Sequence, residues 1–596
     1  MKSHPHLVPR DHIYALVIYT LVTLAFLYSY LLNPNGFNGF GDDAVFANAF
    51  WWFKRCLVEF KNPFYSDYLF HPDGMSLVFH TTTYSNFILT LPVNLLFGVN
   101  AAVNTSYFIG FILCGYFTFL LVYDLTSSKS AAIIAGIIFS FSPFHFSQGR
   151  GHLHMATLQW LPLYFLLLKR ALEGRRALQA LYAGVALGLI ILTDQLQTIC
   201  AVLASGIILA VAFIASEKNV STVKRVGSQL GFIVVVASLS SSFYLFPTLR
   251  EILTNRSATR VDVLEHGGAN MFSADLLGFV IPGFHSLWGS MFSSFNLGRD
   301  SVVYLGIITL ALALYGGWHR RDDLTVRCVG LVAFCFWIMT MGTYLHVNGV
   351  WVFAGMRIPL PYLAMIDIPL LGENRTPCRF HLMTILALAV LAGYGFRELL
   401  NRVGKISNQR HALLLVAIPL LILVETLPAH QDPGATHVPP VFREMARDKE
   451  VYSVLQLPLS RWSAIIKHGS GNPSSMMYYQ TIHEKQIFGG LASRLAIDAL
   501  DFNDQILNLL VDVSAYDNVM LAQKKQPSAV DIESHRQLGR MLVPQREAFL
   551  KKYGIRYIVL HPPLTGDTES RAFLESFIGK EFRADVDGSL LYLKVY

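Results

Sequence analysis

The chain has 596 residues, of which 53% are hydrophobic and 15% are charged, and its mean hydropathy is +0.43. Soluble domains carry about 25% charged residues, so this composition excludes an ordinary soluble protein and predicts a polytopic membrane protein. The net charge of +7 does not indicate a nucleic-acid partner, because Lys and Arg occur in short clusters between apolar segments. The six cysteines show no metal-ligand spacing, so neither a disulfide framework nor a zinc site is predicted.

The first twelve residues are polar, and the apolar segment after them lacks a small-residue cleavage site. We therefore interpret this segment as a retained helix and not as a signal peptide. About eleven spanning helices are predicted along the chain, since each needs roughly 20 apolar residues. Their ranges are 13–32, 101–123, 130–146, 155–168, 177–193, 196–215, 226–249, 302–318, 328–345, 380–396 and 411–428.

The connections between these segments alternate in charge. Short connections that hold many basic residues alternate with longer connections that hold few. The positive-inside rule places the basic connections and the N-terminus in the cytoplasm, and an odd number of spans then places the C-terminus outside. The apolar segment 86–98 contains Pro92 and is too short to cross comfortably, so we expect it to be interfacial or re-entrant.

The composition changes near residue 430, where charged residues become frequent and no later apolar run is long enough to span. Strand-like runs alternate there with helical patterns, as in a small α/β domain. We therefore expect a transmembrane catalytic domain over 1–429, with a long first outer loop at 33–85, and a soluble extracytoplasmic domain over 430–596. The predicted strands lie at 451–457, 557–560 and 590–596, and the predicted helices at 496–510 and 533–553.

Two adjacent aspartates, Asp42 and Asp43, lie in the first outer loop. They precede an amphipathic segment, 44–60, whose Trp51 and Trp52 are typical of the bilayer interface, so this segment is expected to lie on the membrane. Capping of this helix explains one carboxylate readily and two less well. A cation, a basic partner or an acceptor hydroxyl would each explain the pair, and we expect at least one of the two to be functional.

The outer turn 147–154 carries Arg150, His152 and His154 on one side. Two histidines bind a metal only with further ligands, and lone histidines more often form local hydrogen bonds, so no metal is expected here. Arg150 lies between two glycines, which allows close approach to an anion, and arginine is the usual residue for bidentate phosphate contacts. Contact with a lipid headgroup is the alternative for Arg150.

Two further sets of polar residues are predicted at the outer face. Asp194 and Gln195 lie between two helices with almost no loop, where an ionisable group is costly and is a functional candidate, although a role in the turn is an alternative. Glu373, Arg375 and Arg379 flank the start of the tenth helix, which has a proline suited to its first turn. Because the two arginines are four residues apart and helix N-termini attract anions, we expect a phosphate or pyrophosphate site here.

Taken together, these features resemble the GT-C superfamily of membrane glycosyltransferases. The resemblance rests on the first helix, the long outer loop that opens with Asp42 and Asp43, the interfacial helix, the later helices and the C-terminal extracytoplasmic domain. It implies an acidic active-site residue in the first outer loop and a sugar donor linked to polyprenyl phosphate or pyrophosphate. The Trp-Trp-Asp signature of oligosaccharyltransferases is absent, which argues against transfer of a whole glycan to asparagine.

The expected function is transfer of a sugar from a polyprenyl-phosphate donor to an extracytoplasmic glycan, lipid or protein acceptor, by an integral protein of the plasma (inner) membrane. Asp43 or Asp42 would act as the base, and arginines would hold the leaving phosphate without a metal or other cofactor. The alternatives are a transporter or lipid flippase, with a path through the membrane, and a non-catalytic envelope scaffold, with scattered sites. The expected partners are donor, acceptor and membrane lipids, and the expected substrate-binding residues are Arg150, His152, His154, Asp194, Gln195, Glu373, Arg375 and Arg379.

Overall fold

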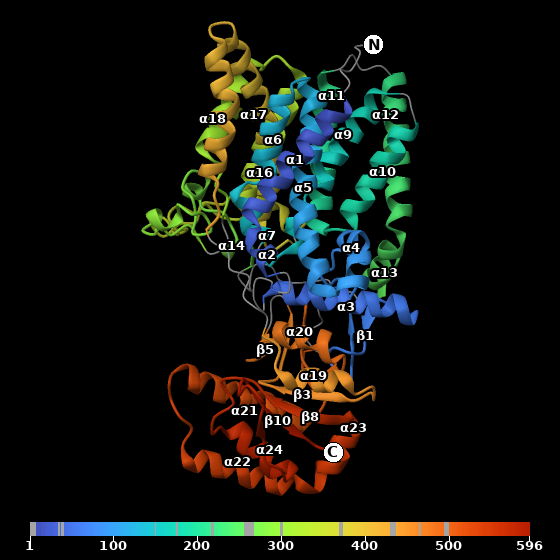
Figure 1. Ribbon diagram of the computed structural model, residues 1–596, viewed down its shortest axis with the longest axis vertical. Coiled ribbons are helices and arrows are strands. Elements are labelled where there is room, and N and C mark those ends of the chain that lie inside the picture. Colours follow the sequence, from blue (N-terminus) through green and yellow to red (C-terminus); the bar gives the residue numbers. More distant parts are fainter. Residues whose placement is uncertain are drawn as a thin grey trace.

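A helical bundle forms one end of the elongated molecule, and a region that contains β-sheets forms the other (Figure 1). The helix α3 (Asp42–Glu59) runs across the bundle between the two (Figure 1). The C-terminus lies in the region that contains the sheets (Figure 1). This computed structural model describes residues 7–33, 36, 41–149, 151–174, 177–215, 220–254, 268–298, 302–368, 374–429, 437–463, 467–493 and 500–596.

Each segment predicted to span the membrane overlaps one or two helices of the bundle, so the helical predictions are confirmed. Within the ranges given above, six helical segments are long and apolar enough to cross a membrane, namely Val99–Thr126, Lys129–Gly149, Gln195–Ala215, Ser221–Ser240, Pro377–Gly404 and Asn408–Glu425. The number of spans therefore stays a prediction. The bundle helices are α1 (Pro9–Phe26), α2 (Tyr28–Leu32), α5 (Val99–Thr126), α6 (Lys129–Ser140), α7 (Pro143–Gly149), α8 (Leu153–Ala156), α9 (Trp160–Glu173), α10 (Ala177–Ile191), α11 (Gln195–Ala215), α12 (Val220–Ser240), α13 (Ser242–Thr254), α14 (Gly268–Met271), α15 (Ile307–His319), α16 (Leu324–Thr340), α17 (His381–Gly404) and α18 (Asn408–Glu425).

The helix α17 packs against α15, α16 and α6, and its first sixteen residues are all buried. Two glycines allow it to approach α15 closely: a Cβ atom at Gly316 or Gly395 would collide with the backbone of the other helix. Small residues at such contacts favour close packing of membrane helices. This packing fixes the start of α17, where a short 3-10 helix (Pro377–Phe380) carries one of the predicted arginines.

The segment 86–98 forms α4 (Tyr84–Phe97), a 14-residue helix with Pro92 inside it. It lies at the end of the bundle nearest the sheets (Figure 1), as an interfacial or re-entrant helix would. Trp51 and Trp52 do not form the interfacial aromatic belt inferred from the sequence, and the position of α3 on the membrane stays a prediction. Each is 3% exposed, because α3 packs against the C-terminal region, where the Trp51 Nε1–H donates to Glu484 Oε1 at 3.3 Å. Both indoles therefore face protein and not lipid headgroups.

The C-terminal region contains a five-stranded sheet with the order β6-β3-β8-β10-β9. The three predicted strands are confirmed as its centre: β3 (Ser453–Leu457) is parallel to β8 (Ile555–Leu560), and β10 (Leu591–Lys594) is antiparallel to β8. The edges are β6 (Gln486–Ile487) and β9 (Arg583–Ala584), and a smaller sheet contains β5 (Lys467–Gly469), β4 (Ser460–Ser463) and β7 (Gly490–Ala492), in that order.

Helices cover this region. The predicted helix 533–553 is divided into α22 (Ala529–Leu542) and α23 (Arg546–Tyr553). The helix predicted from residue 496 begins later, as α21 (Gln505–Ala522), where Asp504 caps its first turn, and residues 494–499 lie outside the described residues. The remaining helices are α19 (Pro440–Arg447), α20 (Pro473–His483) and α24 (Glu569–Ile578), and the first outer loop adds a short hairpin of β1 (Tyr65–Ser66) and β2 (Met75–Ser76).

The first outer loop and the C-terminal region are packed together. The Asn48 Nδ2 group of α3 donates to Met477 O and to Gln480 Oε1, each at 2.9 Å. The guanidinium of Arg461, which is fully buried, donates to Asp73 Oδ2 at 3.1 Å. These contacts hold the C-terminal region against the end of the bundle, where the loops that carry the predicted site residues gather.

Candidate functional site

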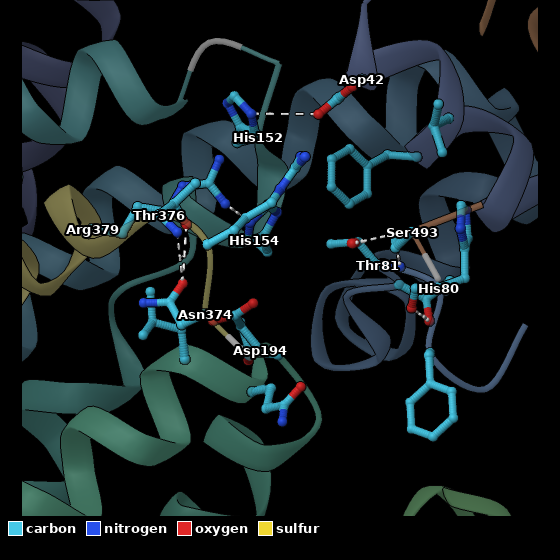
Figure 2. A pocket seen from close by; sticks show the side chains of 18 of the residues that line it. Asp42, His80, Thr81, His152, His154, Asp194, Asn374, Thr376, Arg379 and Ser493 are labelled. Atoms are coloured by element: carbon cyan, nitrogen blue, oxygen red, sulfur yellow. Dashed lines mark hydrogen bonds and ion pairs between the residues drawn. The ribbon is translucent and has the colours of Figure 1, made fainter. Parts of the chain in front are cut away.

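A cavity of about 420 Å³ lies where the bundle, the first outer loop and the C-terminal region meet. Its walls come from segments that are far apart in the sequence (Figure 2). Of the residues predicted to form the site, those that line the cavity are Asp42, His152, His154, Asp194, Gln195, Arg375 and Arg379.

Asp42 and Asp43 have different surroundings. Both lie in the first turn of α3, after Gly41, and neither is the N-cap residue. Asp42 lines the cavity, its side chain is 50% exposed, and its Oδ2 lies 3.4 Å from His152 Nε2. Asp43 is fully buried, and the Tyr107 hydroxyl donates to its Oδ1. Because successive residues of a helix point about 100° apart, one carboxylate faces the cavity and the other faces the core.

Arg379 lies on the opposite side of the cavity from the first outer loop (Figure 2). Its Nε–H donates to Gln148 Oε1 at 3.1 Å, and its Nη1 lies 3.2 Å from His154 Nε2. Burial, and then the charge of Arg379, hold the pKa of the His154 imidazole well below its usual value, so its Nε2 is a neutral acceptor. Among the described residues, no carboxylate forms an ion pair with Arg379, so its charge remains available to an anion.

Asp194 lies in the turn between α10 and α11. Its Oδ1 accepts a hydrogen bond from Gln197 N at 3.0 Å, which starts α11. Enclosure in the cavity wall raises the pKa of the Asp194 carboxyl, and the nearby Arg379 opposes this shift. Gln197 in turn donates to His154 O at 2.6 Å, so the start of α11 also supports the segment that contains the two histidines.

Arg375 lies before α17, in a loop that is stabilised by hydrogen bonds between its two neighbours. Thr376 donates to Asn374 Oδ1 through its backbone N–H at 3.2 Å and its hydroxyl at 3.1 Å. The Arg375 guanidinium lies 5.7 Å from the centre of the Phe272 ring and lines the cavity. The two predicted arginines thus belong to the same wall. Two other predictions, Arg150 and Glu373, lie outside the described residues and remain predictions.

The opposite wall was not predicted from the sequence. It contains His80 and Thr81 of the first outer loop, together with Ser493, Trp462 and Lys467 of the C-terminal region. The hydroxyls of Thr81 and Ser493 lie 2.7 Å apart and join the two segments (Figure 2). The polar run His-Thr-Thr-Thr at 80–83 of a long outer loop was the available signal, but nothing in the sequence pairs it with residues about 400 positions later.

A metal site is not evident. In the parts of the chain that the structure describes, no group of three or more His, Cys, Asp or Glu side chains is arranged to hold a metal ion. Asp42 and His152 supply two adjacent ligand atoms, and His154 is engaged with Arg379. The positive charge in the described cavity comes instead from Arg375, Arg379 and Lys467.

No protein-family model matches the sequence, and no curated protein matches it. Solved structures do match. The arabinofuranosyltransferase AftD from Mycobacteria superposes with a TM-score of 0.53 at 13% identity, over 99% of this chain and 40% of AftD. ArnT from Cupriavidus metallidurans bound to undecaprenyl phosphate gives a TM-score of 0.50 at 11% identity, over 99% of each chain. The Archaeoglobus fulgidus oligosaccharyltransferase tethered to an acceptor peptide gives a TM-score of 0.50 at 14% identity, over 98% of this chain and 74% of that protein.

All three are membrane glycosyltransferases of the GT-C superfamily. The chain has the GT-C fold. The resemblance stated from the sequence is therefore confirmed at the level of the fold, as a polytopic helical membrane protein whose C-terminal region contains strands. The superposed part of AftD is less than half of that protein, whereas ArnT is matched along almost its whole length.

Proposed function

We propose that the protein is a membrane glycosyltransferase that moves a sugar from a polyprenyl-phosphate donor to an extracytoplasmic acceptor. The observation that carries this proposal is the cavity under the first outer loop of a GT-C fold, which is lined by Asp42, Arg375 and Arg379 together. The undecaprenyl phosphate bound by the similar ArnT supports a lipid-linked donor. We also retain the two proposed domains, 1–429 and 430–596, with the cavity on the extracytoplasmic side.

The arginine wall suits the donor phosphate. When the glycosidic bond breaks, the leaving phosphate gains negative charge, and cations that are already in place stabilise that charge. Arg379 is held by the neutral acceptors Gln148 and His154, which orient the guanidinium without neutralising it. A guanidinium also presents two parallel N–H groups to phosphate oxygens. Arg375 lies on the same wall and would share the phosphate.

Burial favours Asp42 over Asp43 as the base. A base must reach the acceptor hydroxyl, and the Asp42 side chain is half exposed in the cavity beside His152. Asp43 is fully buried, with a hydrogen bond from Tyr107. We propose that Asp42 receives the acceptor proton, and that Asp43 positions the first turn of α3. Asp194, Gln195, His152 and His154 would contact the substrates or hold the arginines in place.

The shape of the cavity favours transfer over transport. Its described lining comes from elements at the end of the bundle nearest the C-terminal region, and includes no residue from the opposite helix ends. A transporter would need a path that continues between the helices. A scaffold would leave the polar groups scattered, whereas the residues named above converge.

The test is an in vitro assay of the purified protein with a panel of polyprenyl-phosphate sugars. Asp42→Asn is expected to lower transfer by about 10²–10⁴, as loss of a general base does. Arg375→Ala and Arg379→Ala should each weaken transfer or donor binding by roughly 1.5–3 kcal/mol, and lysine should not restore a bidentate contact. Arg443→Ala, at an exposed position of α19, is the matched control and should have no effect.

Asp43→Asn tests the proposed role of Asp43 in positioning the first turn of α3. It should lower transfer less than Asp42→Asn, because Asn still accepts the hydrogen bond from Tyr107. Unchanged donor binding and turnover in all four variants would remove this cavity from the mechanism. A larger loss in Asp43→Asn than in Asp42→Asn, at equal expression, would reverse the two proposed roles.

A further inference from the structure

The cavity wall formed by the C-terminal region contains an aromatic ring paired with a lysine. Trp462 and Lys467 are cross-strand partners in β4 and β5, so their side chains meet on one face of the small sheet. The Lys467 Nζ lies 4.3 Å from the centre of the Trp462 ring, and the indole N–H donates to Gly469 O at 3.4 Å. The pair is therefore a fixed feature of the C-terminal region at the cavity.

Lys467 is exposed and has no ion pair with any described carboxylate; the contact that holds it is the indole ring. A cation–π contact orients an ammonium without cancelling its charge. An anionic group of a ligand in the cavity can therefore approach Lys467 without displacing a protein carboxylate. Arg379 lies across the cavity from His80 and Ser493 (Figure 2), and Arg375 belongs to the same segment, before α17.

The third member of this wall is His80. It is only 6% exposed, it lines the cavity, and its Nδ1 has no hydrogen-bond partner among the described residues. A buried polar atom without a partner costs free energy, and a ligand bound in the cavity would supply the partner that His80 Nδ1 lacks. The hydroxyls of Thr81 and Ser493 lie beside it (Figure 2).

We propose that His80, Trp462 and Lys467 form the acceptor subsite, and that the acceptor is a carbohydrate with an acidic substituent. This inference rests on the proposed function. An aromatic ring packs against the C–H face of a sugar, and the imidazole and hydroxyls match its hydroxyl groups. The lysine selects a phosphate or carboxylate near the hydroxyl that receives the sugar. Because this wall is formed by the C-terminal region, that region would choose the acceptor, while the bundle holds the donor.

The experiment measures saccharide binding to the purified full-length protein by saturation-transfer NMR. The probes are methyl glucoside, glucuronate, glucose 6-phosphate and inorganic phosphate. The acidic sugars should bind more tightly than methyl glucoside. Lys467→Gln should weaken only the acidic sugars, by about tenfold, as expected for a lost charge-assisted hydrogen bond. Trp462→Leu should weaken binding of all three sugars. Trp462→Phe keeps an aromatic ring and should keep most of the binding, which would show that substitution at this position does not unfold the site. Lys525→Gln, an exposed lysine away from the cavity, is the control.

The outcomes separate the two proposals. A second measurement follows binding of undecaprenyl phosphate, which Arg379→Ala should weaken and Lys467→Gln should not. Saccharide binding that is absent from the wild type, or unchanged in both Lys467→Gln and Trp462→Leu, overturns the acceptor subsite and leaves the proposed function standing. Inorganic phosphate that binds as tightly as glucose 6-phosphate, and depends on Lys467, overturns the carbohydrate assignment. Failure of undecaprenyl phosphate to bind the wild type counts against the proposed function instead.

Discussion

A neutral histidine holds the charged arginine at the centre of the site. Because the pKa of His154 lies well below its ordinary value, its imidazole stays neutral at pH 7 and accepts the hydrogen bond from Arg379. We expect His154→Gln, whose amide oxygen can accept the same bond, to retain most donor binding, and His154→Leu to lose it. The measurement is the donor KM alongside kcat, since a positioning role should appear mainly in KM.

The acid limb of the pH profile is a second check on His154. Because burial and the charge of Arg379 hold the pKa of His154 well below that of an ordinary histidine, this residue stays neutral where a free histidine takes up its proton, so mild acidification should not weaken donor binding through it. The wild type and His154→Gln should therefore show the same pH dependence of donor KM. A wild-type KM that rises towards acid and becomes flat in His154→Gln would show that His154 titrates in the working range.

Another buried histidine affects the stability of the C-terminal region. His483 is fully buried at the end of α20, its Nδ1 accepts a hydrogen bond from Lys485 N at 3.0 Å, and burial lowers its pKa to about 3. The unfolded chain takes up a proton near pH 6.5, but the folded protein does not, so stability should fall on acidification by about 1.4 kcal/mol per pH unit below that point. Thermal unfolding of the full-length protein across this range is the measurement. His483→Asn, which keeps an acceptor and does not titrate, should flatten the dependence.

At the scale of elements, Arg461 joins the first outer loop to β4. Its fully buried guanidinium donates to Phe70 O at 3.1 Å and to His71 O at 3.2 Å, besides Asp73. Arg461→Ala would leave the Phe70 and His71 carbonyls without this donor, and a buried polar group that loses its partner costs about 1–3 kcal/mol. The lost pair with Asp73 adds little, because the Asp73 side chain is 47% exposed. We expect faster proteolysis of the loop at residues 61–74 and loss of transfer, since the same junction supports His80. Arg556→Ala is the comparison: this arginine is 22% exposed and pairs with Asp448 at the surface, so its loss should have a much smaller effect.

Local patterns along the chain were enough to predict some elements and not others. The strands β3, β8 and β10 could be predicted because each is a short apolar run between polar segments. The arginine wall could be predicted because Arg375 and Arg379 lie at a helix start. The opposite wall, with His80, Ser493 and Trp462, could not, because its halves are brought together by packing of the first outer loop on the C-terminal region. The same packing buries Trp51 and Trp52, which by composition resemble interfacial residues.

At the scale of the whole molecule, the basic connections lie at the end of the bundle opposite the C-terminal region. The loops at 127–128, 320–323 and 405–407 lie at that end, whereas the cavity and the sheets lie at the other (Figure 1). The charge pattern and the arrangement of the helices therefore both support the proposed topology, in which the two ends face different compartments. A lipid-linked donor would enter the cavity from the membrane at the same end as the acceptor. Donor and acceptor would therefore meet without either of them crossing the bundle.

This topology predicts a labelling pattern. Val586 is 91% exposed in the C-terminal region, and the side chain of Asp322, between α15 and α16, is 89% exposed at the other end. Five of the six native cysteines are buried and Cys335 is partly exposed, so a background with Cys335→Ser should label weakly. An impermeant maleimide added to intact cells or spheroplasts should modify Val586→Cys directly, and Asp322→Cys only after the membrane is opened. The reverse pattern would place the cavity in the cytoplasm. Reaction of both positions from outside would mean that the number of spans between them is even, and would require one of the shorter helices to stop within the membrane.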